Sequence, residues 1–350
     1  MAKLFYKDKP IVGLDIGQTG VKVMAVDTKK WLVTAYGSID LDPAKVQESL
    51  DKRDNYLSDG IQTLMQKNII GNLPSNHVVV GIPASRTFTR SFTIPIKAMK
   101  KLRDAVELEA EQYIPIPANL LYIDFEIIHK TKDTVTVLMC AAPKAIVDQT
   151  VEAAEMAGFR VCMVEPSVNA VARLLETTEE GNLPTVIVDI GAASTDIAIL
   201  DGSIRVTGGV SVGGNTFTLD IAKKLDVTLE TAHQMKVLNG LSPGSKQHKI
   251  SGALSPSLEK IADEVRKIIR YYKERINEDR KLEQVLVVGG GSNVPGIGEF
   301  FTNELIMAAR VASPWQTLDF GKLPQPAKQF RPRYITVAGL ASIKPEDVVQ

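Results

Sequence analysis

Two Asp-Ile-Gly turns, far apart in the chain, carry residue types that could bind a polyphosphate. Each turn follows an apolar run and precedes an apolar alternation, which predicts a strand, a tight turn and a second strand. Glycine lets the backbone approach an anion closely, and successive N–H groups form an anion-binding nest. Two such hairpins predict two halves of the protein that face one polyphosphate. The turn residues concerned are Gly17, Gln18, Thr19, Gly20 and Lys22 in the first copy and Gly191, Ala192, Ala193, Ser194 and Thr195 in the second.

Three acidic residues of the matched hairpins are candidates for a magnesium site: Asp15, Asp189 and Asp196. Magnesium keeps most of its water ligands in proteins, so carboxylates can hold it through that hydration shell. The alternative is that each aspartate only caps its own turn. We favour the metal site because the acids recur at matched places, and the expected cofactors are therefore ATP or ADP with Mg²⁺.

Further glycine-rich segments fit a nucleotide site. A buried apolar run at 285–288 leads into Gly289, Gly290, Gly291 and Ser292, where missing side chains would let a purine or ribose lie against backbone. The alternative is a tight turn between a strand and a helix, for which one glycine would be enough. Upstream, two glycine pairs, Gly208-Gly209 and Gly213-Gly214, flank an expected short strand, and Asn215 is expected to cap a helix that begins at Phe217.

Composition limits the functional classes. Forty-one basic and forty-one acidic residues leave no net charge, which argues against a general nucleic-acid-binding protein. The two cysteines, Cys140 and Cys162, lie in apolar strand-like surroundings and predict reduced thiols rather than a disulfide or metal site. Residues 1–10 lack the apolar core of a signal peptide, and no apolar stretch approaches the ~20 residues that cross a bilayer. We therefore expect a cytoplasmic protein.

The order of expected elements defines two α/β halves. The first half is predicted at 1–84 and 164–185, an inserted α/β unit at 85–163, the second half at 186–235 and 284–343, and a smaller subdomain at 236–283. Within the last of these, a Gly-, Ser- and Pro-rich loop is expected at 240–257, followed by an amphipathic helix at 258–283. The basic side chains of that helix share their face with several acids and predict a solvated surface. They are Arg266, Lys267, Arg270, Lys273 and Arg275.

Two further helices, at 165–174 and 334–342, are rich in small residues. Small side chains let two helices cross closely and shear when two halves close on a ligand. They complete a set of five motifs: two phosphate hairpins, a glycine-rich turn and two connecting helices.

In their order and spacing these motifs resemble those of the actin and seventy-kilodalton chaperone superfamily of ATP-binding proteins. The resemblance implies two related α/β domains that flank a nucleotide cleft. Within the superfamily, residues 109–125 (EAEQYIPIPANLLYIDF) resemble the PilM family of type IV pilus assembly proteins, on the FtsA-like branch. This branch carries a distinctive inserted subdomain, which we expect at 85–163. FtsA ends in an amphipathic membrane helix, whereas residues 344–350 here cannot form one.

The PilM resemblance implies a cytoplasmic protein docked at the inner membrane through partners, with no direct membrane insertion. It implies ATP binding and recognition of the N-terminal cytoplasmic tail of the membrane protein PilN in a groove along the inserted subdomain. Contacts with PilO through PilN, with pilus motor ATPases, and with further copies of the chain are compatible with it. The candidate residues for the PilN tail are Tyr113, Ile114, Pro115 and Ile116.

Two positions depart from the superfamily pattern or leave a role open. The ribose-contacting helix of relatives often carries Glu and Lys three residues apart; here Lys236 is kept, but His233 stands where Glu is common. Glu165 matches a position that orients water in the chaperone relatives, and it could equally cap the connecting helix. If hydrolysis occurs, Glu165, Asp15 and Asp189 are the residues we expect to take part.

Three functions remain compatible with the motifs. The first is an ATP-binding assembly protein with at most slow hydrolysis, since the motifs supply a phosphate cradle without an evident strong base. The second is a small-molecule kinase of the same fold, although no acceptor-pocket signature is present. The third is a filament-forming division protein like FtsA. The fold alone does not choose among them.

Overall fold

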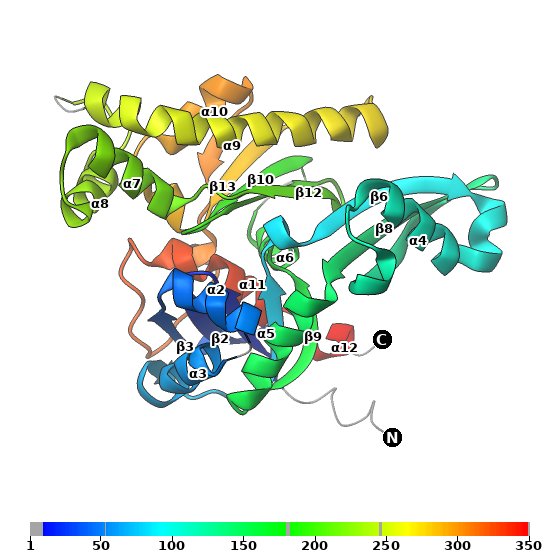
Figure 1. The fold of residues 1–350 in the computed structure, drawn as a ribbon, viewed down its shortest axis with the longest axis horizontal. Coiled ribbons are helices and arrows are strands. Elements are labelled where there is room, and N and C mark those ends of the chain that lie inside the picture. The colour runs from blue at the N-terminus through cyan, green and yellow to red at the C-terminus, as the bar shows by residue number, and fades with distance from the viewer. Residues whose placement is uncertain (1–9, 53, 180–182, 245–246, 349–350) are drawn as a thin grey trace.

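The computed structural model describes residues 10–52, 54–179, 183–244 and 247–348, and it forms two α/β halves with a third unit projecting to one side (Figure 1). The first half is built on a six-stranded sheet of order β4-β3-β2-β1-β5-β9. Strands β1, β2 and β3 form an antiparallel meander, and β5 and β9 run parallel to β1. The strands are β1 Val12–Gly17, β2 Gly20–Asp27, β3 Leu32–Asp40, β4 Ile69–Gly71, β5 His77–Ile82 and β9 Arg160–Pro166.

Helices cover both faces of this sheet. Helices α2, α3 and α5 pack on the outer face, because each presents an apolar stripe to the sheet. Helices α6 and α11 lie between the two halves, where their small and branched side chains contact strands of both sheets. These helices are α2 Pro43–Lys52, α3 Tyr56–Lys67, α5 Lys144–Met156, α6 Ser167–Thr178 and α11 Ile335–Ala341.

The second half is built on an eight-stranded sheet of order β14-β13-β10-β11-β12-β6-β8-β7. Four helices cover its outer face around the largest core of the protein. The strands are β6 Phe88–Pro95, β7 Leu121–Lys130, β8 Thr134–Pro143, β10 Thr185–Ile190, β11 Thr195–Leu200, β12 Ile204–Val210, β13 Gln284–Val288 and β14 Ala309–Val311, and the helices are α7 Gly214–Leu225, α8 Leu229–Leu238, α9 Gln247–Arg275 and α10 Ile297–Leu305.

The inserted unit expected at 85–163 is divided between the two sheets. Strands β6, β7 and β8, with helix α4 (Leu102–Tyr113), form a core of their own and continue the second sheet. Helix α5 and strand β9 instead pack into the first half. The part of the insertion that packs as a separate unit therefore runs from β6 to β8, and we call it the side unit. It meets strand β12 at one ladder pair, Arg90 with Val206, and at a hydrogen bond from Ser91 Oγ to Arg205 O at 3.1 Å.

Helix α9 departs from the expected boundaries at both ends. The loop expected at 240–257 is helical from Gln247 onward, and the helix ends at Arg275 rather than at 283. Buried apolar residues upstream continue the helical stripe through Pro256, which therefore lies inside the helix. Proline has no N–H for the carbonyl four residues earlier, and Lys224 Nζ donates to that carbonyl, of Gly252, at 2.9 Å. The missing helical hydrogen bond is thus replaced by a side chain.

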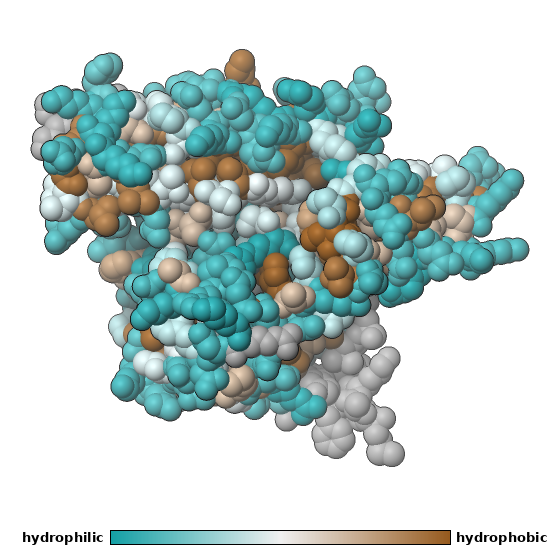
Figure 2. Space-filling view, viewed as in Figure 1, coloured by the Kyte–Doolittle hydropathy of each residue, from teal (hydrophilic) through white to brown (hydrophobic). Residues whose placement is uncertain are grey.

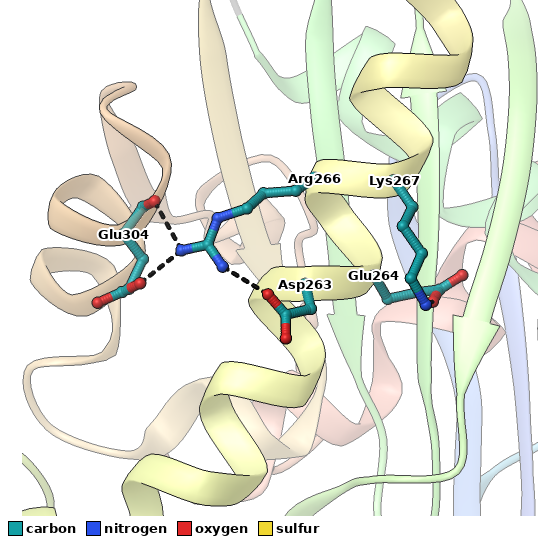
Figure 3. A network of polar contacts seen from close by, with 5 residues as sticks. All are labelled: Asp263, Glu264, Arg266, Lys267 and Glu304. Atoms are coloured by element: carbon teal, nitrogen blue, oxygen red, sulfur yellow. Dashed lines mark hydrogen bonds and ion pairs between the residues drawn. The ribbon is translucent and has the colours of Figure 1, made fainter.

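Two basic residues of α9, Arg266 and Lys267, form ion pairs near the surface, in agreement with the expected solvated face. Arg266 bridges Asp263 at 2.7 Å and Glu304 of α10 at 2.5 Å, and Lys267 bridges Glu264 at 3.0 Å (Figure 3). The side chains of these five residues, Asp263, Glu264, Arg266, Lys267 and Glu304, lie at the surface or close to it. These pairs satisfy local charge, so Arg266 and Lys267 do not form a free basic patch.

The chain ends bear on the membrane expectations. Residues 1–9, which carry most of the segment examined for a signal peptide, lie outside the described part of the structure. A short helix, α12 (Pro345–Val348), is the last element described. Within the described ranges, no helix is both long enough and apolar enough to cross a bilayer.

Candidate nucleotide site

The first phosphate hairpin forms as expected, and its two charged residues pair. Strands β1 and β2 join through Gly17 and Gly20, and Asp15 lies opposite Lys22 in the antiparallel register. Lys22 Nζ contacts Asp15 Oδ2 at 2.9 Å, with both side chains largely shielded from solvent. The turn therefore presents backbone and one cation, already balanced by one carboxylate.

The second hairpin places two buried carboxylates side by side. Asp189 on β10 lies opposite Asp196 on β11. Burial, and then the charges of Asp196 and Asp15, raise the pKa of Asp189 to about 7, although Thr336 Oγ1 donates to it at 3.4 Å. Burial also raises the pKa of Asp196 to about 6. The charges of Asp15 and Asp196 thus both act on Asp189, and that of Asp15 also acts on Asp196.

This arrangement fits a hydrated cation better than a directly ligated one. Buried like charges are costly, and a divalent cation among them would offset that cost. Yet no group of three acidic, histidine or cysteine side chains among the described residues is placed to hold a metal directly. Carboxylates that reach the ion through its water shell satisfy both observations.

The start of helix α7 packs directly on the second phosphate turn. The backbone N–H groups of Gly214 and Asn215 donate to Gly191 O at 2.9 Å and Ala192 O at 2.8 Å. A Cβ on Gly213 would lie 2.7 Å from both of these carbonyls, so only glycine fits there. The helix begins at Gly214 with Gly213 as its N-cap, so the expected capping role of Asn215 is wrong. The pairs Gly208-Gly209 and Gly213-Gly214 were expected to flank a strand. They do not, because Gly208 and Gly209 lie within β12.

Lys236 is the buried cation of the second half. Its Nζ donates to Gly214 O at 2.7 Å and to Thr218 Oγ1 at 2.8 Å, which orients it toward the start of α7. Burial lowers the pKa of Lys236 to about 8. One turn earlier on α8, burial and then the charges of Lys236 and Arg333 lower the pKa of His233.

The glycine-rich turn after β13 approaches the second hairpin closely. Gly289 has a φ of 80°, and a Cβ on it would lie 2.2 Å from Asp189 Oδ1. A Cβ on Gly291 would lie 2.2 Å from a methyl group of Ile190. Tight packing therefore explains these two glycines. Gly290 is different, because a Cβ on it would have the Arg333 side chain as its nearest neighbour, at 3.2 Å. It is therefore the glycine most free to face a ligand.

Glu165 is the penultimate residue of strand β9 and is almost fully buried. Its Oε2 accepts from Arg173 Nη2 at 2.5 Å, and Arg173 Nη1 donates to Gly339 O at 2.8 Å. Its Oε1 is buried without a hydrogen-bond partner among the described residues. Burial raises the pKa of Glu165, while Arg173 opposes this shift. The N-cap of α6 is Pro166, which has no side-chain cap, so the geometry does not favour the capping role considered for Glu165.

The two connecting helices cross as tightly as their small residues predict. A Cβ on Gly339 of α11 would lie 2.1 Å from Ala170 O of α6. Thr336 of α11 also reaches Asp189, a contact that the sequence pattern did not identify. A threonine inside a helix carries no signal of a partner 147 residues away.

The candidate partner residues differ in accessibility. Tyr113 ends α4 and is 46% exposed, with its ring 4.3 Å from the Arg90 guanidinium carbon. Pro115 is exposed and Ile116 is half-buried. Ile114, however, is 4% exposed and packs in the core of the side unit, so its side chain cannot be a direct partner contact. Figure 2 shows apolar side chains gathered where the side unit meets the two halves.

The paired hairpins, the crossing helices between two sheets and the position of the side unit define an actin-like ATPase fold. Solved structures share it. The chain aligns with the PilM-PilN type IV pilus biogenesis complex at a TM-score of 0.79 and 23% identity, covering 95% of this chain and 97% of that one. It aligns with EutJ from Carboxydothermus hydrogenoformans at 0.57 and 18%, covering 95% and 88%. For ADP-bound MreB5 of Spiroplasma citri the values are 0.50 and 15%, with 95% of each chain covered.

The sequence identifies the branch of this fold. Residues 13–343 match the family described as type IV pilus assembly protein PilM, and the chain belongs to that family. Cell division protein FtsA of Borreliella burgdorferi is 27% identical over 210 residues, which cover 54% of this chain and 50% of FtsA. FtsA of Neisseria meningitidis is 36% identical over 81 residues, covering 23% and 19%. The chain thus spans at most half the length of these two relatives.

Proposed function

We propose that the chain binds ATP or ADP with Mg²⁺ between its two halves. The observation that carries this proposal is the set of buried carboxylates Asp15, Asp189 and Asp196, whose mutual repulsion a hydrated divalent cation would relieve. The glycine turns beside them supply backbone N–H groups of the kind that bind phosphate. Lys22 and Lys236 supply positive charge from the two halves. MreB5, which shares the fold, is described as bound to ADP.

The nucleotide is held rather than rapidly consumed in this proposal. Glu165 is the one acid at the expected water-orienting position, and Arg173 occupies one of its oxygens. That oxygen is therefore not free to accept a proton from an attacking water, although burial raises the pKa of Glu165 overall. We therefore assign at most slow hydrolysis to the chain, with Glu165, Asp15 and Asp189 as the residues involved.

The partner in this proposal is the N-terminal cytoplasmic tail of a PilN-type membrane protein. Support comes from family membership and from the similar fold in a complex described as PilM-PilN. We place the tail against the side unit near Tyr113, Pro115 and Ile116, where aromatic and apolar surface is accessible. The protein would then sit on the cytoplasmic side of the inner membrane through PilN. PilO reached through PilN, the motor ATPases and further copies of the chain are additional partners in the same scheme.

The proposal can be tested by titrating the purified chain with a peptide that copies the PilN tail, with and without Mg-ATP, in a calorimeter. Saturable binding should weaken in Tyr113→Ala but not in Leu108→Ala, a matched control on the same helix that is 64% exposed. Mg-ATP should bind the wild type and fail to bind Asp189→Asn. Peptide binding that survives Tyr113→Ala unchanged would move the groove elsewhere. Absence of peptide binding in every nucleotide state would sink the PilN assignment.

A further inference from the structure

A three-residue helical turn, η1 (Ala84–Arg86), links the two halves and the side unit. It follows strand β5 of the first sheet and leads into strand β6 of the side unit. Its backbone is held by the second half: the N–H of Ala84 donates to Asp196 Oδ2 at 2.7 Å, and the N–H of Ser85 donates to Asp196 Oδ1 at 3.1 Å. Both carboxylate oxygens of the buried Asp196 therefore accept hydrogen bonds from the backbone of η1.

The neighbouring strand is shaped to admit this contact. Gly209 on β12 lies opposite Asp196 in the register. A Cβ on Gly209 would lie 3.0 Å from Thr195 O and 3.1 Å from the Ser85 Cα. A side chain there would push η1 away from the carboxylate. The contact between Asp196 and η1 thus accounts for one glycine of the Gly208-Gly209 pair, for which the nucleotide site gives no reason.

The other side of η1 faces the first phosphate turn. Arg86 lines a small hollow together with Gly17 and Gln18 of that turn. Its Nη2 donates to Gln47 Oε1 of α2 at 2.6 Å, which fixes the side chain in the first half. Three consecutive residues therefore contact the second phosphate hairpin and line a hollow beside the first.

From η1 the chain enters the side unit through a narrow attachment. Strand β6 meets β12 at the Arg90–Val206 pair and at a hydrogen bond from Ser91 Oγ to Arg205 O at 3.1 Å. Arg90 lies between two rings, 4.3 Å from Tyr113 and 4.1 Å from Tyr271 of α9. Because the attachment is narrow, the orientation of the side unit depends strongly on the direction in which the chain leaves η1.

We propose that Asp196 is a positioning residue that couples occupancy of the nucleotide site to the orientation of the side unit. The inference rests on the proposed nucleotide site and names its regulation. Asp196 is one of the three acids that face a hydrated cation there, and it is the one that also accepts from η1. A change in the position of its carboxylate when Mg-nucleotide binds moves η1, and η1 carries β6 and the partner-binding surface with it.

Hydrogen–deuterium exchange on the full chain, with and without Mg-ATP, tests this coupling at two places. Protection of residues 289–292 reports nucleotide binding itself. Exchange at residues 85–95 reports η1 and the entry to the side unit. In the wild type we expect Mg-ATP to change both. Protection at 289–292 with no change at 85–95 would overturn the coupling, whereas no protection at either place would show that the nucleotide site itself is wrongly assigned.

Two substitutions break the contact from opposite sides. Asp196→Asn replaces one carboxylate oxygen with an N–H donor, so the Ser85 amide should exchange about tenfold faster or more without nucleotide, as expected on losing a hydrogen bond to a charged acceptor. Ala84→Pro removes the shorter of the two hydrogen bonds to Asp196, keeps the one from the Ser85 N–H, and leaves every residue of the proposed site intact. Proline suits this first helical position, since Pro83 already has an extended φ and ψ of −53° and 138°.

The decisive variant is Ala84→Pro, because Asp196→Asn could also weaken nucleotide binding directly. We expect Ala84→Pro to keep protection at 289–292 and to lose the nucleotide response at 85–95. Ala84→Gly, which keeps the N–H group, is the matched control and should respond as the wild type does. A full response at 85–95 in Ala84→Pro would refute the role of Asp196. So would a loss of response in Ala84→Gly equal to that in Ala84→Pro, because the N–H group would then be irrelevant.

Discussion

At the scale of single residues, the site is dominated by charge held away from water. Asp189 and Asp196 face each other, with the charge of Lys22 acting on Asp189, and the buried Lys236 donates to Gly214 O and Thr218 Oγ1. Each of these groups carries a desolvation cost, which its hydrogen bonds offset in part and an oppositely charged ligand would offset further. The residue types and their spacing made this much predictable. The backbone donors of Ala84 and Ser85 could not be predicted, because a sequence does not show which partner a backbone N–H group will have.

Lys236 gives the site a pH dependence with a definite sign. Its pKa in the folded chain is lowered from 10.5 to about 8, so it loses its charge as the pH rises through 8. An anionic nucleotide favours the charged form, so binding takes up a proton above that pH. We expect the dissociation constant for Mg-ATP to rise by up to about tenfold per pH unit between about 8 and 10. Calorimetric titrations across this range measure it.

The Lys236→Gln variant provides the control for this profile. Glutamine keeps a donor for Gly214 O but has no charge to lose, so its weaker affinity should stay constant over the same range. A flat profile in the wild type, or an equally steep one in Lys236→Gln, would contradict the assignment.

At the scale of elements, local patterns were predictable and long-range pairings were not. Both phosphate hairpins and both connecting helices form where the sequence indicates, because a turn and its flanking strands are decided within about fifteen residues. The sequence predicts the start of α9 too late, because Pro256 is expected to break a helix. The division of the insertion was missed because nothing local shows that β9 pairs with β5 while β6 pairs with β12.

The crossing of α6 and α11 should depend strictly on Gly339. A methyl group there would meet the Ala170 carbonyl at 2.1 Å, and backbone cannot move aside as a flexible side chain can. We expect Gly339→Ala to lower the free energy of unfolding by about 3 kcal/mol. Urea denaturation followed by circular dichroism measures the change.

Gly252→Ala is the matched control, with an effect of opposite sign. Gly252 lies inside α9, where a Cβ would meet only Lys224 Nζ, at 3.6 Å. Alanine is the better helix former, so stability should rise by about 0.5 to 1 kcal/mol. Equal destabilisation by both substitutions would show that the helix crossing is not the reason.

At the scale of the whole molecule, the side unit belongs to both halves. Its strands extend the second sheet, while its chain enters from η1 and leaves into α5, which packs on the first half. Beyond one strand pair, the Arg90 guanidinium between Tyr113 and Tyr271 secures the unit to α9. Cation–π contacts of this kind are worth about 0.5 to 2 kcal/mol each.

Removing that stack should loosen the side unit without affecting the nucleotide site. We expect Arg90→Ala to increase the radius of gyration measured by X-ray scattering and to leave Mg-ATP affinity unchanged. Arg103→Ala, at a surface pair with Glu107 on α4, should change neither quantity. If Arg90→Ala scatters as the wild type does, the single strand pair and the core contacts are sufficient to fix the unit.

The short contact between β6 and β12, at the adjacent residues Arg90 and Ser91, also lets the side unit act as a lever. Strand β6 has eight residues and is therefore about 26 Å long. The paired residue Arg90 lies five residues from the far end of β6, so a rotation of about 5° there displaces that end by about 1.4 Å. Under the proposed coupling, a small rotation at the phosphate turns is thereby magnified at the rim of the molecule, where we place the extended peptide.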